Sequence, residues 1–315
     1  MKKNKKIFFT LSGLVLATMY GMNRMEYHTC LSKGILSTDK KEHYSWRFGT
    51  ITYHKKGTGA PLLLIHDLTP GSSSYEFSHI EDLLAQTNTV YTIDLLGYGH
   101  SDKPNITYTN YLYVQLITDF IKKVMGKKTS LAATGCSAVS AVMAIHNDAE
   151  LADKLILIHP QDLYEGNQIP SAQLKLLKMF IDFPIIGTFI YNLHTNKASF
   201  QTQFLYEYFY RPTSDMDTIV DAYSESAHID LCRGKYAYSS YLAKYGNTNC
   251  ISALKNIDNS ILLISGEKST LSETNEGNYQ YFNRSIETIR ITNSKNLPQL
   301  ENPKETAERI LEFLS

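Results

Sequence analysis

Residues 129–147 read TSLAATGCSAVSAVMAIHN, and this stretch decides the fold of the chain. Its first part, Ser130–Thr134, is a short run that predicts a buried strand. Four small residues follow at 135–138, and apolar residues then recur at helical spacing between 141 and 145. The stretch therefore predicts a strand that turns directly into a helix packed on a sheet.

The turn has the pattern of a nucleophile elbow, in which a strained strand-to-helix turn lifts a serine hydroxyl above the sheet. Ser137 is the predicted nucleophile, Gly135 stands two residues before it, and the backbone N–H of Ala138 would face an oxyanion. Two residues after the serine the motif expects glycine, where the chain has Val139. Two other interpretations stay open: an ordinary small-residue junction of an α/β protein, and an elbow with Cys136 as the nucleophile.

Composition sets wide limits and excludes little. The chain has 315 residues, 43% of them apolar and 20% charged, which is ordinary for a globular protein with a substantial core. Because 31 basic residues balance 31 acidic ones, nothing favours a nucleic-acid partner. The cysteines at 30, 136, 232 and 250 show no metal-binding or disulfide spacing, so we expect no metal and no cofactor.

The N-terminus predicts a membrane anchor. Four lysines within residues 2–6 precede an uncharged run of 17 residues, Ile7–Asn23, at the short end of what spans a bilayer. Lysines before the run place the N-terminus in the cytoplasm and the main domain outside the cell membrane. We expect a signal anchor over residues 1–25 and a linker over 26–43; a cleaved signal peptide and an amphipathic or buried helix remain alternatives.

From residue 44 onward strands alternate with helices. Strands are predicted at 46–53, 61–65, 89–95, 130–134, 154–159, 261–265 and 287–292, and helices at 73–86 and 108–125. This alternation predicts an α/β fold with a mainly parallel sheet and helices on both faces. Residues 163–247 show helical patterns without a convincing strand, so we expect them to form a helical cap over the carboxyl ends of the strands.

Several segments, in the expected order, resemble the α/β-hydrolase family. PLLLIHDLTPGSSSYEF (61–77) is similar to its strand and oxyanion loop, with Asp67 in the place of a glycine, and VYTIDLLGYGHSDKP (90–104) resembles its D-x-x-G-x-G-x-S-x-x-P segment. ILLISGEKS (261–269) and NSKNLPQLENPKETAERILEFL (293–314) resemble the segments that carry the catalytic acid and histidine. The resemblance covers residues 44–315 and implies a capped member of this fold, here a membrane-anchored bacterial one.

The same resemblance implies an incomplete triad. Asn296 stands where the family has its histidine, and Ser269 stands where it has its acid. A serine needs a base to remove its proton, and an asparagine cannot accept one. No histidine follows His228 in the chain.

Two functions remain in contention. The first is an anchored protein that has lost ordinary hydrolysis and keeps a lidded pocket for an apolar or acyl ligand. The second is an active serine esterase or acyl hydrolase in which His228 is the base, Glu267 or Asp162 is the acid, and the N–H groups of Leu68 and Ala138 form the oxyanion hole. A weaker third is a surface protein whose lid binds another protein.

Overall fold

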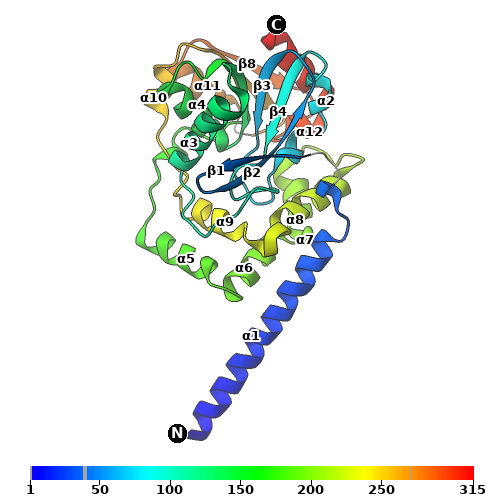
Figure 1. The fold of residues 1–315 in the computed structure, drawn as a ribbon, viewed down its shortest axis with the longest axis vertical. Coiled ribbons are helices and arrows are strands. Elements are labelled where there is room, and N and C mark those ends of the chain that lie inside the picture. Colours follow the sequence, from blue (N-terminus) through cyan, green and yellow to red (C-terminus); the bar gives the residue numbers. More distant parts are fainter. Residues whose placement is uncertain (1, 38–40, 271) are drawn as a thin grey trace.

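In the computed structural model, which describes residues 2–37, 41–270 and 272–315, eight strands form one sheet (Figure 1). The strands are β1 (Glu42–Trp46), β2 (Gly49–Lys56), β3 (Ala60–Ile65), β4 (Asn88–Ile93), β5 (Thr129–Thr134), β6 (Ala152–Ile158), β7 (Ser260–Gly266) and β8 (Ile286–Ile291). Their order is β1-β2-β4-β3-β5-β6-β7-β8. β2 pairs antiparallel with β1 and β4, and every other pair is parallel. The predicted, mainly parallel sheet is confirmed.

Helices cover both faces of this sheet. The helices are α1 (Lys2–Leu31), α2 (Glu81–Leu84), α3 (Asn110–Phe120), α4 (Ser137–Asn147), α5 (Ala172–Asp182), α6 (Ile186–Thr195), α7 (Lys197–Gln203), α8 (Met216–Cys232), α9 (Lys235–Leu242), α10 (Ile251–Lys255), α11 (Ser272–Phe282), α12 (Pro298–Glu301) and α13 (Pro303–Leu314). α3, α4, α10 and α11 lie on one face, and α2 and α13 on the other (Figure 1). Leu62–Ile65 of β3 are fully buried because both faces are covered.

Two predicted elements differ from the observed ones. The strand predicted at 46–53 is a hairpin, in which Trp46 of β1 pairs with Gly49 of β2 across a two-residue turn. The helix predicted at 73–86 is broken into a single turn at Ser74–Phe77 and the short α2. The break matters for the site described below, because the first turn carries the buried Glu76 toward the sheet.

The cap follows β6. Between β6 and β7 the structure describes every residue, and α5 to α10 occur there without a strand. A cluster of buried residues rich in aromatic side chains, among them Phe200, Phe204 and Tyr223, holds α5 to α9 together, whereas α10 packs against α4 and α11. The predicted helical insert is confirmed.

α1 is longer than the predicted anchor. It continues to Leu31, so the first six residues of the predicted linker are helical, while residues 38–40 of that linker lie outside the described residues. Its C-terminal half packs against α6 and α8, and its N-terminal half extends away from the body (Figure 1). Among the helices of the described part of the chain, none alone has the length and apolarity to cross a membrane; α5 and α6 together do, but with a 98° bend between them.

Candidate active site

The junction between β5 and α4 is the elbow of the fold, and its left-handed residue is Gly135. Gly135 has a φ of 53°, in the region that favours glycine. Its carbonyl accepts a hydrogen bond from Ala138 N at 3.4 Å, which closes the turn into α4. The strained position from which a nucleophile would project is thus a glycine without a side chain.

Ser137 lies two residues further on, in the first turn of α4. Its side chain is fully buried, and its hydroxyl donates to the carbonyls of Thr134 at 2.8 Å and Ile65 at 3.3 Å. The expectation that this hydroxyl stands above the sheet is therefore wrong, because the turn occurs earlier in the chain. Ala138 N is likewise part of the helix turn rather than a donor that faces an oxyanion.

Two other backbone N–H groups converge at the elbow, and a carboxylate already occupies them. Oδ1 of Asp67 accepts from Cys136 N at 2.6 Å and from Leu68 N at 2.7 Å. These are the N–H after the elbow residue and an N–H of the β3 loop, the two groups that form an oxyanion hole in this fold. The N–H of the predicted Leu68 thus points to the elbow together with Cys136 N rather than Ala138 N, and both donate to the carboxylate of Asp67.

Gly135 and Asp67 depend on each other. A Cβ on Gly135 would lie 2.3 Å from Cγ and Oδ1 of Asp67, closer than any real Cβ contact. A serine at this position cannot coexist with the observed Asp67 side chain. Gly135, Cys136 and Asp67 each keep some accessible surface, so the elbow is blocked chemically without being sealed from solvent.

A second carboxyl group lies behind the first. Oε2 of Glu76 accepts from Thr134 Oγ1 at 2.7 Å and from Asp67 N at 3.1 Å, while Oε1 is buried without a hydrogen-bond partner among the described residues. Burial, together with the charge of Asp67, raises the pKa of Glu76 to about 7. Burial also raises the pKa of Asp67, although the hydrogen bonds from the N–H groups of Cys136 and Leu68 partly lower it.

The two family positions near the end of the chain hold no proton-transfer groups. Asn296 donates from Nδ2 to the carbonyl of Glu207 at 2.9 Å and from its backbone to the carbonyl of Tyr208 at 2.9 Å. It thus ties the loop after β8 to the cap. Ser269 lies after β7, and its backbone N–H closes a turn onto Gly266 O at 3.1 Å.

The predicted substitutes do not assemble with Ser137. His228 is fully buried in α8, where Nδ1 lies 2.7 Å from Ser224 O and the ring faces Tyr191. Glu267 is exposed and pairs with Lys268 at 2.9 Å. Asp162 accepts from Tyr164 N and Glu165 N in a turn before the cap, at 2.7 and 3.3 Å.

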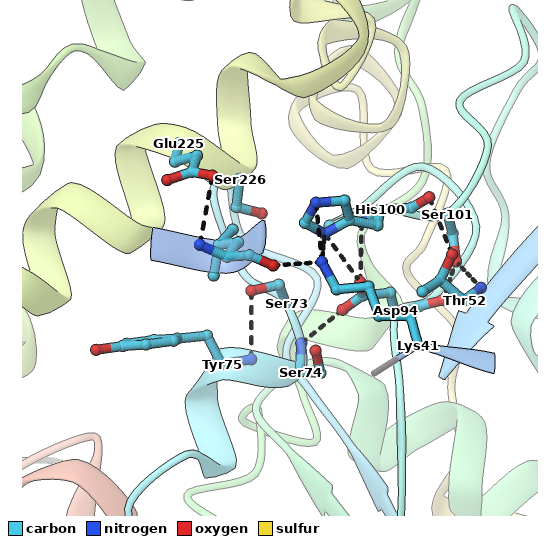
Figure 2. A network of polar contacts seen from close by, with 12 residues as sticks. Lys41, Thr52, Ser73, Ser74, Tyr75, Asp94, His100, Ser101, Glu225 and Ser226 are labelled. Carbon is cyan, nitrogen blue, oxygen red and sulfur yellow. Dashed lines mark hydrogen bonds and ion pairs between the residues drawn. The ribbon is translucent and has the colours of Figure 1, made fainter. Parts of the chain in front are cut away.

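The D-x-x-G-x-G segment, by contrast, forms a complete network (Figure 2). Oδ1 of Asp94 accepts from Ser74 N and Oδ2 from His100 N, both at 2.8 Å. Ser101 Oγ donates to the carbonyl of Asp94 at 2.5 Å. Lys41, from the segment before β1, approaches both ring nitrogens of His100, at 2.9 and 3.0 Å, beside a cavity of about 250 Å³. This network fixes the loop and links the segment after α1 to the body.

The fold and this loop define an α/β hydrolase. The family model described as alpha/beta hydrolase family matches residues 62–309, so the chain belongs to this family.

Its relatives share the fold more than the sequence. The chain is 30% identical over 102 residues to an uncharacterized protein of Mycobacterium tuberculosis, a match that spans 32% of this chain and 29% of that protein. Among solved structures, a serine hydrolase involved in carbazole degradation has a TM-score of 0.69 at 16% identity, over 87% of this chain and 98% of that one. A bacterial membrane phospholipase A has a TM-score of 0.67 at 18% identity, over 100% of this chain and 98% of that one.

The sequence held a signal that points to Gly135. If the elbow is shifted by two residues, its pattern becomes Ala133-Thr134-Gly135-Cys136-Ser137, with small residues on both sides of the central position. The Ser137 register, with Val139 at its end, fits this rule less well. The buried Glu76 carries no comparable sequence signal.

Proposed function

We propose that this α/β-hydrolase family protein is a non-hydrolytic, membrane-associated binding protein for an apolar or acyl ligand. One observation carries the loss of hydrolysis: the Asp67 carboxylate accepts hydrogen bonds from both N–H groups of the oxyanion hole, opposite a glycine at the elbow. A single oxyanion donor contributes about 3 kcal/mol to transition-state stabilisation. With the hole occupied by a carboxylate, this stabilisation is replaced by repulsion of a developing negative charge.

A cavity between α1 and the cap supports the ligand-binding part. It has a volume of about 320 Å³, and its lining includes Tyr20, Tyr27, Pro184, Ile185 and Leu231. Ligand pockets have volumes from about 300 Å³ upward and are mostly apolar with a few polar groups. Arg24, Arg233 and Lys235 also line this cavity. Aromatic and aliphatic walls beside three cationic side chains suit an acyl chain that ends in an anionic group.

Membrane association is supported by the outer surface of α1. Its described N-terminal part exposes large apolar side chains, namely Leu11, Leu14, Val15, Leu16 and Tyr20. Exposed apolar stretches of this kind mark contact with a membrane or another protein. The structural relative named a membrane phospholipase A is similar over the whole chain, α1 included.

A fluorophosphonate probe tests the loss of hydrolysis on the full-length protein in detergent. We expect no labelling of the wild type and no turnover of short acyl esters above a Ser137→Ala variant. Labelling at the rate of an ordinary serine hydrolase, abolished in Ser137→Ala, contradicts the proposal.

Displacement of a fluorescent fatty acid tests ligand binding. We expect binding that Arg233→Glu weakens several-fold, because this change reverses a charge at the cavity, and that Lys255→Glu, outside the cavity, leaves unchanged. Equal affinity in both variants excludes the cavity as the binding site.

A further inference from the structure

Three metal-ligand side chains meet where α1 packs against α8. Glu26 and Cys30 are one helical turn apart on α1, and His228 faces them from α8. One ligand atom from each lies within 4.8 Å of those of the other two. Cys30 and His228 are buried, and Glu26 is partly buried. This group belongs neither to the elbow nor to the loop network of Asp94.

The imidazole of His228 has a free ring nitrogen that can bind a metal ion. Nδ1 lies 2.7 Å from the carbonyl of Ser224, which fixes its proton on that nitrogen. Nε2 is then an unprotonated acceptor, and it is buried without a hydrogen-bond partner among the described residues. A metal-binding histidine commonly donates its other ring N–H to a backbone carbonyl in this way. An unsatisfied buried nitrogen is costly, so the arrangement calls for a group that the protein chain itself does not supply.

The sulfur of Cys30 is supported from both sides. Its thiol lies 3.4 Å from Oε1 of Glu26, and the hydroxyl of Ser224 donates to Sγ at 3.1 Å. Ser224 thus contacts both the histidine, through its carbonyl, and the cysteine, through its hydroxyl. Such outer contacts orient the ligands of a metal site.

Cys232 lies four residues after His228 and can complete the set after a local movement, since its sulfur is outside the 4.8 Å group formed by the other three. Cys232 is 2% exposed and interacts electrostatically with both Glu26 and Cys30. The backbone from Asp230 to Cys232 leaves the helical conformation, with φ between 54° and 61°, so the end of α8 is bent at this point. The set of one carboxylate, one imidazole and two thiols is one that zinc accepts in a tetrahedral site.

We propose that Glu26, Cys30 and His228, completed by Cys232, bind a divalent transition-metal ion, zinc by preference, that joins α1 to the cap. Donors around tetrahedral zinc lie roughly 3.4–3.8 Å apart, so Glu26, Cys30 and His228 close by about 1 Å on binding, and Cys232 moves further. On binding, each thiol gives up a proton to solvent and becomes a thiolate. No metal-binding motif in the sequence indicates this site, because its ligands come in pairs from two helices about 200 residues apart.

Metal analysis and cobalt substitution test the site on the full-length protein in detergent. We expect one zinc per chain. After chelation, we expect Co²⁺ to give the thiolate charge-transfer and strong visible bands of a tetrahedral sulfur-ligated ion. Both signals are read on the wild type, so the test does not depend on a variant that folds.

Variants then assign the ligands. Cys30→Ser and His228→Gln should weaken zinc binding at least a hundredfold, Cys232→Ser should reduce the charge-transfer intensity, and Glu26→Gln should weaken binding more mildly. Cys250→Ser is the matched control, because Cys250 is also a buried free cysteine but lies in the core beside α10, and it should bind as the wild type does.

Three results overturn the proposal: no cobalt bands in the wild type, zinc affinity that Cys30→Ser and His228→Gln leave unchanged, or a Cys30–Cys232 disulfide in the purified chain. The assignment is independent of the proposed loss of hydrolysis, since a protein that hydrolyses esters through Ser137 can still bind zinc here; Cys232 also lines the proposed ligand cavity, so zinc binding and fatty-acid binding are measured separately.

Discussion

Two loops of this molecule use the same device, a carboxylate set against a glycine and two backbone N–H groups. In the loop after β4, Asp94 accepts from Ser74 N and His100 N, and a Cβ on Gly99 would lie 2.3 Å from its Cγ. At the elbow, Asp67 stands in the same relation to Gly135, also at 2.3 Å. The first arrangement holds a loop of the family fold, and the second stands where the family carries out its chemistry.

The surroundings of the two carboxylates differ. Burial would raise the pKa of Asp94, but the His66 ring and the N–H groups of His100 and Ser74 lower it overall. The pKa of Asp67 is raised by burial, and its neighbour is a second carboxyl, Glu76. The surroundings of Asp94 therefore stabilise its ionised form, whereas Asp67 accepts from Cys136 N and Leu68 N in a less favourable environment. The comparison teaches that the same carboxylate–glycine arrangement occurs in two loops of the fold, in different electrostatic surroundings.

Rebuilding the reaction centre should give the largest effect. Combining Asp67→Gly, Gly135→Ser, Asn296→His and Ser269→Asp frees the oxyanion hole and supplies a nucleophile, a base and an acid. We expect ester hydrolysis at least about a thousandfold above the wild type, since the loss of a triad serine or histidine costs about a millionfold. The rate with a short acyl ester measures it.

The matched control for this rebuilding keeps Gly135 and makes the other three changes; it should stay inactive. If the complete variant folds, shown by an unchanged circular dichroism spectrum, and still does not hydrolyse the ester, the assignment of the elbow to Gly135 is wrong.

Substituting the two glycines compares the loops directly. Gly135→Ala and Gly99→Ala should each lower the free energy of unfolding by about 4 kcal/mol, because each combines a left-handed φ with a clash against a carboxylate. Adding Asp67→Gly should recover much of the loss at Gly135. Adding Asp94→Gly should not recover the loss at Gly99. Either change leaves two backbone N–H groups without their acceptor, but only Asp67→Gly also removes a buried charge beside Glu76, whereas Asp94 is stabilised by His66. Urea unfolding of the four variants measures the difference.

Equal recovery of the free energy of unfolding in both loops would contradict the proposed difference between Asp67 and Asp94. It would mean that Asp94 contributes no more to the fold than Asp67, and that the two carboxylates are interchangeable structural groups.

The pH dependence of stability should reveal Glu76. Its pKa is about 7 in the folded protein against an ordinary 4.5, so between these values the folded state binds more protons than the unfolded state. The free energy of unfolding should therefore fall as pH rises from 4.5 to 7, by about 3 kcal/mol for this group, and level off above. Glu76→Gln should remove this fall and exceed the wild type in stability at pH 8.

The difference between the two proteins is the quantity to measure, by urea unfolding at several pH values. Glu301, whose pKa burial also raises to about 7, is present in both and cancels. An identical pH profile for wild type and Glu76→Gln would show that Glu76 is already ionised in the fold, and that Asp67 and Glu76 carry two charges side by side.

The sequence predicted the fold but placed the elbow two residues too far along the chain, at Ser137 instead of Gly135. The strands and the cap followed from apolar periodicity, and the terminal segment showed Asn296 where the family resemblance expects a histidine. The position of the elbow could not be predicted in this way. Ser137 and Gly135 match part of the motif in the sequence, whereas the left-handed backbone conformation occurs at Gly135 itself. Asp67 was visible as a misplaced residue, but its contact with Cys136 N joins segments 69 residues apart and only the folded chain shows it.

Ser137→Ala should have the smallest effect. The buried hydroxyl donates to Thr134 O and Ile65 O, and losing such a hydrogen bond costs about 1 kcal/mol; Ile65 O keeps the hydroxyl of Thr134 as a donor at 3.4 Å. We expect a modest decrease in the midpoint of urea unfolding, with ligand binding and any background ester hydrolysis unchanged. A serine that worked as a nucleophile would give the opposite pattern, an almost unchanged stability and a complete loss of turnover. The pair of measurements therefore separates a structural hydroxyl in the first turn of α4 from a reactive one at the elbow.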